Sequence, residues 1–160
     1  MKKPKKKSGS EENKSIIALN KKAFRNFFIL NTYEAGIALE GCEVKSIRDH
    51  RVNLRDSYSR IRNSQLFLYN MHISPYSKSR IGDINPTRTR KLLMHRKEIG
   101  KIEGKLTDRS LTIVPLRVYM IKNRVKIELA LVKGKAGRDK RQDIQEREHK
   151  IEMKRALKKY

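Results

Sequence analysis

The chain has little cysteine, few aromatic residues and no long hydrophobic runs. Cys42 is the only cysteine, tryptophan is absent, and 37% of the residues are hydrophobic. A single cysteine excludes an internal disulfide and fits a reducing compartment. No apolar run reaches the length of a transmembrane helix, about 18 residues, and no apolar stretch typical of a signal peptide follows the lysine-rich start. No basic amphipathic helix with a broad apolar face is evident. We therefore expect a cytoplasmic protein without a membrane partner.

Residues that usually carry catalysis are scattered along the chain. Four histidines lack the spacing of metal ligands: His50, His72, His95 and His149. Cys42 has no partner cysteine and is more typical of a small core residue than of a nucleophile. The 17 carboxylates are too dispersed to nominate an acid–base pair, and the glycines form no phosphate-binding loop. We expect a binding protein, not an enzyme, with no cofactor, metal or small-molecule substrate.

Positive charge is what the chain has in excess. Forty lysines and arginines against 17 acidic residues give a formal net charge of +23 in 160 residues. Residues 1–14 carry +4, residues 15–132 carry +13 and residues 133–160 carry +6. A segment that can fold yet holds the largest share of the repulsive charge indicates a polyanionic partner, and nucleic acid is the obvious one.

Three zones follow from the composition. Residues 1–14 are mostly lysine, serine, glycine and glutamate, so we expect a disordered tail. Residues 133–160 have too few apolar residues to hold a helix on a core. We expect this basic tail to be disordered when free and helical on a polyanionic surface.

Residues 15–132 have a mostly strand-like pattern. The pattern predicts a strand in residues 24–30 and a hairpin in residues 54–73 that turns at Asn63-Ser64. A second hairpin is predicted from residues 111–121 and 124–132, with a bulge or edge position at Pro115. Alternation in residues 125–131 predicts one buried and one solvated face.

Two helices are predicted among these strands. Asn85-Pro86 has the form of a helix start, and Leu92, Leu93, Ile99 and Ile102 recur at roughly helical spacing up to Gly104. A shorter helix is expected over residues 43–48. Many short strands with two or three short helices predict a mainly β fold, a small OB-like antiparallel barrel, flanked by flexible basic tails.

Candidate RNA contacts are aromatic and basic. The tyrosines could stack on bases or merely pack, half-buried, in the sheet: Tyr33, Tyr58, Tyr69, Tyr76 and Tyr119. Five cations crowd one segment, which could bind RNA or simply be a solvated helix face: Arg88, Arg90, Lys91, Arg96 and Lys97. Motifs for sequence-specific DNA reading are missing.

Several runs together resemble the SsrA-binding protein family (small protein B). The longest, YEAGIALEGCEVKSIR, occupies residues 33–48. The others occupy residues 20–23, 56–58, 72–76, 85–93, 114–116 and 139–141. The resemblance covers about residues 20–157, with these runs in unbroken order. The resemblance implies an OB-like barrel that binds the tRNA-like domain of tmRNA and leaves its aminoacyl end open for alanylation and elongation factor Tu. It also implies entry into stalled ribosomes, where the C-terminal tail probes the empty mRNA channel and the decoding centre of the small-subunit rRNA.

The resemblance also assigns site residues. The tmRNA-contacting positions are expected at Asn20, Glu34, Arg90, Lys91, Leu93 and His95. The ribosome-contacting tail positions are expected at Lys135, Arg138, Asp139, Lys140 and Arg141. Two positions depart from the family pattern, which usually has Asn at 95 and Lys at 136. Glu34 could accept hydrogen bonds from ribose hydroxyls or base amino groups, or it could brace a neighbouring arginine.

Two other functions remain open. The chain could be an rRNA-binding or ribosome-assembly protein with a basic barrel and tail. It could also be an RNA nuclease, a hypothesis weakened by the missing acid–base or metal cluster.

Overall fold

The computed structural model describes residues 14–76, 85–137, 144–146 and 148–153. The elements follow the order β1 (Ser15–Leu19), α1 (Lys21–Asn26), β2 (Phe27–Ile37), α2 (Gly41–Arg48), β3 (Val52–Asn53), β4 (Tyr58–Arg62), β5 (Gln65–Tyr69), β6 (His72–Ile73), β7 (Arg90–Leu93), α3 (Arg96–Lys105), β8 (Leu111–Ile121) and β9 (Arg124–Gly134). In these described parts, no helix is both long and apolar enough to cross a membrane.

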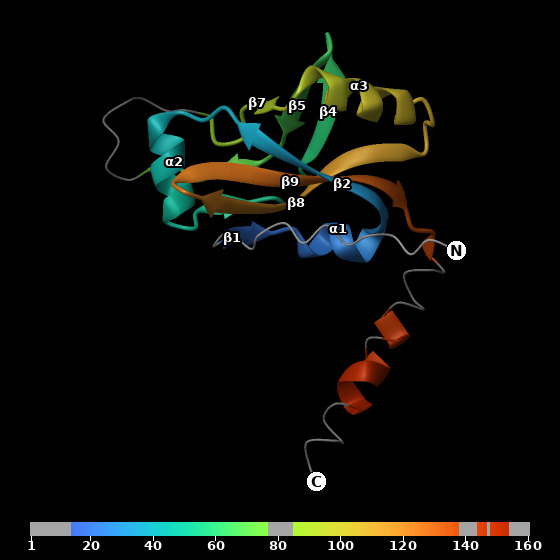
Figure 1. Ribbon diagram of the computed structural model, residues 1–160. Helices are drawn as coiled ribbons and strands as arrows, with labels where there is room; N and C mark the ends of the chain where they lie inside the picture. The colour runs from blue at the N-terminus through green and yellow to red at the C-terminus, as the bar shows by residue number, and fades with distance from the viewer. Residues whose placement is uncertain (1–13, 77–84, 138–143, 147, 154–160) are drawn as a thin grey trace.

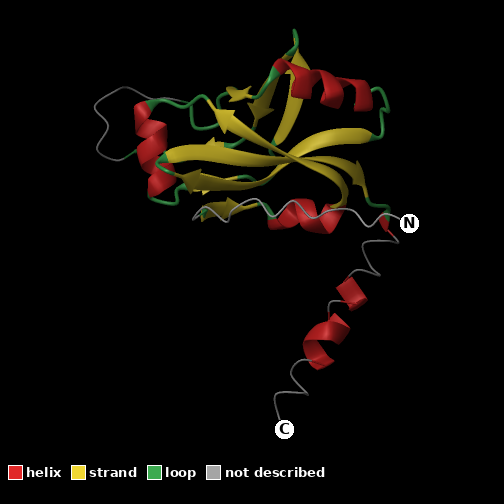
Figure 2. Ribbon diagram, in the orientation of Figure 1, coloured by secondary structure: helices red, strands yellow, loops and turns green. Residues whose placement is uncertain are grey.

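Six strands close into an antiparallel barrel. The sheet order is β1-β8-β4-β5-β7-β2-β9, and an additional pairing between β8 and β9 joins the ends of the six-strand run. Short helices lie around the strands, with α1, α2 and α3 on different sides (Figure 2). The expected mainly β fold, an antiparallel barrel with a few short helices, is confirmed.

Strand β8 changes its partner along one edge. Its first half pairs with β4 at Ile113, and its second half pairs with β1 over residues 117–120. The register with β9 shifts between Pro115 and Arg117. Because proline has no N–H to give to a ladder, it fits the point where pairing is interrupted. The predicted bulge is confirmed.

The described residues form two hydrophobic clusters. The barrel interior contains inward residues of every barrel strand, such as Leu66, Leu92 and Leu129. A second, smaller cluster lies under α1, where Ala23 packs with Ala130 and Val132. The prediction of one solvated face for β9 is therefore wrong at its C-terminal half, since α1 covers the outer side there.

The predicted helix from Asn85 is also wrong over its first half. The side-chain oxygen of Asn85 accepts from the backbone N–H and the hydroxyl of Thr87, which makes a turn. Leu92 and Leu93 belong to strand β7, and the helix begins only at Arg96. Residues 24–30 are likewise divided between the end of α1 and β2. Both hairpins and the helix over residues 43–48 are confirmed.

The C-terminal segment leaves the barrel after β9. The backbone N–H of Lys135 donates to Asn26 O at 2.9 Å. Residues 144–146 and 148–153 are helical and lie away from the barrel (Figure 1), with Ile144, Ile151 and Met153 exposed. Most of the predicted N-terminal tail, residues 1–13, lies outside the described residues, so its disorder stays a prediction. The disorder-to-helix change of the C-terminal tail also stays a prediction.

Candidate nucleic-acid interface

Three of the expected contact residues share the outer face of β2 and β7. Gly36 pairs with Leu93 across these strands, and Ile37 pairs with Leu92. Because side chains alternate along a strand, Glu34 and Gly36 point outward together with Lys91 and Leu93. Burial agrees, since Lys91 and Leu93 are exposed whereas Leu92 is buried. We call Glu34, Lys91 and Leu93 the β2–β7 face.

Glu34 is held in place by donors from two neighbouring strands and from the start of the described chain. Its carboxylate accepts from Lys126 Nζ and from the Tyr119 hydroxyl, and Lys14 Nζ lies 3.7 Å away. The hydrogen bond from Lys126 lowers the pKa of Glu34 most, and the hydrogen bond from Tyr119 lowers it further. Burial is the main cause that raises the pKa of Tyr119, and the hydrogen bond to Glu34 raises it further. The Tyr119 hydroxyl therefore remains a donor. A fixed, ionised carboxylate results, and its side chain is still 39% exposed.

Leu93 protrudes from the sheet next to a position without a side chain. It is 53% exposed, and a Cβ placed on Gly36 would lie 3.2 Å from Leu93 Cβ. A depression beside Leu93 is lined by residues of the β4–β5 turn, β7 and α3, including Lys91 and Arg96. His95 is exposed and immediately precedes α3. The β2–β7 face thus combines an anion, a cation and an apolar side chain.

Arg90 points the other way, into the protein. Its guanidinium is fully buried, and all five of its N–H groups donate hydrogen bonds. Two of these groups, on Nε and Nη2, reach the Glu43 carboxylate at 2.9 and 2.7 Å. The others reach backbone carbonyls of Met71, Pro86 and Arg88. Arg90 is expected among the RNA contacts, but this burial gives it a structural role.

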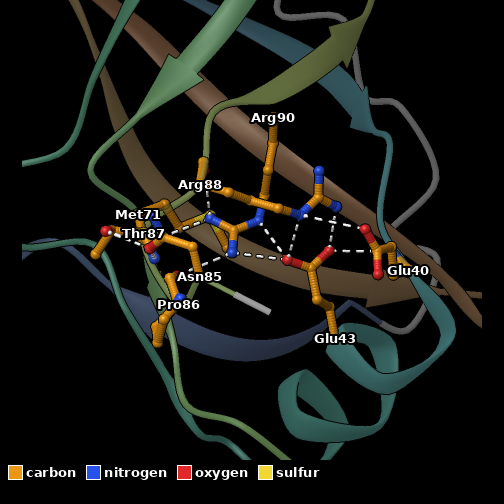
Figure 3. A network of polar contacts seen from close by, with 8 residues as sticks. All are labelled: Glu40, Glu43, Met71, Asn85, Pro86, Thr87, Arg88 and Arg90. Carbon is orange, nitrogen blue, oxygen red and sulfur yellow. Dashed lines mark hydrogen bonds and ion pairs between the residues drawn. The ribbon is translucent and has the colours of Figure 1, made fainter. Parts of the chain in front are cut away.

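Glu43 ties α2 to the segment that leads into β7 (Figure 3). It accepts from Arg88 and Arg90 and from the backbone N–H of Glu40. Burial alone would raise its pKa, but the hydrogen bonds from Arg88, Glu40 N–H and Arg90 outweigh it and lower the pKa. We call Glu43, Arg88 and Arg90 the Glu43 clasp. It fixes the β7 backbone from inside while Lys91 and Leu93 face outward.

Asn20 is also buried, at 6% exposure. Its side-chain oxygen accepts from Ala23 N–H and caps α1, and its amide donates to Leu54 O and Pro115 O. Its backbone N–H donates to Leu116 O at 2.7 Å. These bonds lie where β8 changes partner, so Asn20 closes the gap between β1, α1 and β8. It is not on the β2–β7 face.

The expected stacking tyrosines have different surroundings. Tyr119 is buried beside Glu34, and the Tyr33 hydroxyl lies 3.5 Å from Lys105 Nζ. Lys45 Nζ lies 5.5 Å from the Tyr76 ring centroid. Tyr58 and Tyr69 stack on one another.

Known proteins share this fold and sequence. The family model described as SmpB protein matches residues 17–159. The SsrA-binding protein of Caldanaerobacter subterraneus subsp. tengcongensis is 50% identical over 151 residues, which cover 94% of this chain and 96% of that protein. This chain belongs to the SmpB family.

Another relative and a solved structure are also similar to this chain. The SsrA-binding protein of Carboxydothermus hydrogenoformans is 54% identical over 142 residues, covering 89% of this chain and 95% of that protein. A solved structure of tmRNA–SmpB in the bacterial ribosome contains a similar chain at 40% identity and a TM-score of 0.64. The match covers 75% of this chain and 85% of that one.

Of the tail positions expected for an SmpB-family protein, only Lys135 is described. Its ammonium lies 4.9 Å from the Phe28 ring centroid, so it belongs to the end of the barrel. Arg138, Asp139, Lys140 and Arg141 lie outside the described residues.

The Glu43 clasp is what the sequence analysis missed. Glu43 and both arginines stand in the runs that resemble the family, but no spacing rule links a helix residue to arginines 45 and 47 positions later. Within the described residues, no group of three or more His, Cys, Asp or Glu side chains is placed to hold a metal.

Proposed function

We propose that this protein binds the tRNA-like domain of tmRNA and brings it to ribosomes stalled without a complete codon in the decoding site. The observation that carries the proposal is the common outer face of Glu34, Lys91 and Leu93 in a chain of the SmpB family. The relatives are named for binding SsrA RNA, and the solved structure joins tmRNA and SmpB in the ribosome.

Each side chain of the β2–β7 face has a separate role. The Glu34 carboxylate has lone pairs beyond those that Lys126 and Tyr119 use, so it accepts hydrogen bonds from ribose hydroxyls or base amino groups. Lys91 neutralises a phosphate, and Leu93 makes apolar contact with a base or ribose. His95 donates one hydrogen bond at the edge of the face. The Glu34 carboxylate lies between Lys14 and Lys126. Its negative charge repels a bare phosphate, so this position selects a hydrogen-bond donor of the RNA.

The tail acts in a second step. Lys135, Arg138, Lys140 and Arg141 approach the small-subunit rRNA of the decoding centre and the empty mRNA channel, and Asp139 orients Lys140 or caps the tail helix. The alanylated tmRNA complex also carries elongation factor Tu. Peptide transfer is performed by the ribosome, so the protein itself is an RNA-binding protein without catalysis. The protein acts in the cytoplasm, where translation takes place.

The test of the β2–β7 face compares two variants that raise the net charge equally. Glu34→Gln and Glu103→Gln each remove one carboxylate, and Glu103 is an exposed residue of α3. Generic attraction to RNA would strengthen slightly in both. We expect Glu34→Gln instead to weaken binding to the tRNA-like domain by about tenfold, the equivalent of one charge-assisted hydrogen bond.

The measurement is the dissociation constant at fixed salt by filter binding. If Glu34→Gln binds as tightly as Glu103→Gln, Glu34 does not contact the RNA and the proposed face is wrong. The rRNA-binding alternative would show tighter binding to small-subunit rRNA fragments than to the tRNA-like domain.

A further inference from the structure

The hairpin of β4 and β5 presents a second set of outward side chains. Cross-strand pairs join Tyr58 to Tyr69, Arg60 to Phe67 and Arg62 to Gln65. The alternate residues Ser59, Leu66 and Leu68 are buried, so these three pairs face solvent. None of the tmRNA-contacting positions that the resemblance assigns belongs to this hairpin, although Tyr58 and Tyr69 are among the candidate stacking tyrosines.

Two tyrosine rings stack on this surface, and a guanidinium lies over one of them. The rings of Tyr58 and Tyr69 have centroids 5.3 Å apart and an interplanar angle of 12°. The Cζ atom of Arg60 lies 5.1 Å from the Tyr58 centroid. The two half-buried rings support one another, and the exposed guanidinium of Arg60 rests on the Tyr58 ring. A guanidinium held against a ring in this way offers a flat cationic surface to solvent.

The charges of this surface are not neutralised by any side chain in the described part of the chain. Arg60, Arg62 and Lys91 make no ion pair with any of the described residues. Four carboxylates of the described residues form ion pairs with other cations: Glu43 in the Glu43 clasp, Glu34 with Lys126, Glu128 with Arg117 and Asp56 with Lys22. The outward positions of β4, β5 and β7 contain no acidic residue.

The surface is continuous with the β2–β7 face. Phe67 pairs with Lys91, and the next outward residue of β7 is Leu93. Two strand spacings, about 10 Å, separate β4 from β7. A nucleic acid strand that crosses from Leu93 over Lys91 therefore reaches Arg60.

We propose that an unpaired nucleotide of the bound RNA stacks on Arg60, with Arg62 and Lys91 neutralising flanking phosphates. This inference rests on the proposed function, because it extends the same interface across β5 to β4. The nucleotide must be unpaired, because bases within an A-form duplex are already stacked and present no face to a side chain. The Tyr58–Tyr69 stack positions Arg60 and lowers the entropy lost when the base binds.

The test uses full-length protein and charge-conserving variants. Arg60→Lys keeps the charge but loses the planar group, and Arg124→Lys makes the same change at an exposed residue at the start of β9. The probes are the tRNA-like domain of tmRNA, an unstructured oligoadenylate and an RNA duplex. We expect Arg60→Lys to weaken binding to the first two about fivefold, the low end of one stacked base, and to leave duplex binding and the salt slope unchanged.

A second variant removes the support and leaves Arg60 in place. Tyr58→Leu should weaken binding to the same two probes, in a protein whose thermal melt shows that it is folded at the temperature of the assay. Arg60→Lys and Arg124→Lys are compared on each of these probes. If Arg60→Lys binds the tRNA-like domain or the oligoadenylate as tightly as Arg124→Lys does, Arg60 does not stack on a base of that RNA and the inference is overturned. Failure of the proposed function has a different signature, which is a wild-type protein that does not prefer the tRNA-like domain to other structured RNA.

Discussion

Asn20, Arg90 and Glu34 belong to one set of expected contacts, and burial divides the set. Asn20 and Arg90 are 6% and 0% exposed and fully occupied with internal hydrogen bonds, whereas Glu34 remains partly exposed. Sequence motifs combine both kinds of residue because a position can be constrained by folding or by binding. The sequence could therefore indicate the set, but only the structure separates its buried residues from those exposed enough to contact RNA.

Asn20→Ala tests this separation. The change removes the α1 cap and the two hydrogen bonds that the side-chain amide donates to the carbonyl oxygens of Leu54 and Pro115, although Leu54 O still accepts from Ser57. We expect the free energy of unfolding to fall by about 2–3 kcal/mol. Chemical denaturation measures the loss. RNA affinity, measured where the variant is still fully folded, should stay within twofold of wild type, and a tenfold loss there would make Asn20 an RNA contact.

The Glu43 clasp makes the free energy of unfolding depend on pH. The pKa of Glu43 is lower in the folded protein than its ordinary value of 4.5, so its contribution is complete above that pH. The contribution is lost as the pH falls below 4.5 through the folded-state pKa. Glu43→Ala should cost about 3–5 kcal/mol at pH 7, because it leaves the Arg90 guanidinium buried without its anion.

The measurement is urea denaturation of wild type and Glu43→Ala between pH 7 and pH 3. The gap in unfolding free energy should narrow as the pH falls below 4.5. Asp56, exposed at the surface in its ion pair with Lys22, supplies the control. Asp56→Asn removes the charge and keeps a side chain that tolerates the positive φ of this residue, so it should change stability little at pH 7. A gap that stays constant with pH would show that the clasp does not act through the charge of Glu43.

At the scale of elements, strand alternation predicted both hairpins because each buries one face locally. It failed at β7 and α1 for two physical reasons. An Asn-Pro pair begins turns as well as helices, and the turn at Asn85 leads into a strand through two β-branched threonines. Helix α1 is only six residues long, and its helical form depends on the Asn20 cap and on packing against β8 and β9, which alternation does not reveal.

The close approach of β2 and β7 gives a prediction for these elements. Gly36→Val would place a branched side chain where even a Cβ lies 3.2 Å from Leu93 Cβ. Leu93 must then move, so we expect binding to the tRNA-like domain to weaken about as much as in Leu93→Ala. Double-mutant analysis by filter binding checks this, since Gly36→Val should have little further effect in the Leu93→Ala background. Fully additive losses would contradict a shared cause.

At the scale of the whole molecule, the net charge of +23 indicated a polyanion but not a site. Several cations form ion pairs with the protein's own carboxylates, such as Arg88 and Arg90 with Glu43 and Lys126 with Glu34. Which cations remain for RNA depends on tertiary contacts, and pairs such as Glu34 with Lys126, 92 residues apart, leave no local signal in the sequence.

Salt should weaken RNA binding steeply. If at least six phosphates are neutralised, affinity should fall by about a thousandfold between 50 and 200 mM salt, because bound counterions are released. Titrations of the tRNA-like domain at several salt concentrations measure the slope. Affinity that hardly responds to salt would contradict an electrostatic interface.

The most direct test of the central claim is a filter-binding comparison at one salt concentration. The protein, full-length and truncated after Gly137, is titrated against the tRNA-like domain of tmRNA, an ordinary tRNA and small-subunit rRNA fragments. The account predicts that both forms prefer the tRNA-like domain to the other RNAs, because the barrel carries this interface. Equal affinity for all three RNAs, or a preference that disappears with the tail, would contradict it.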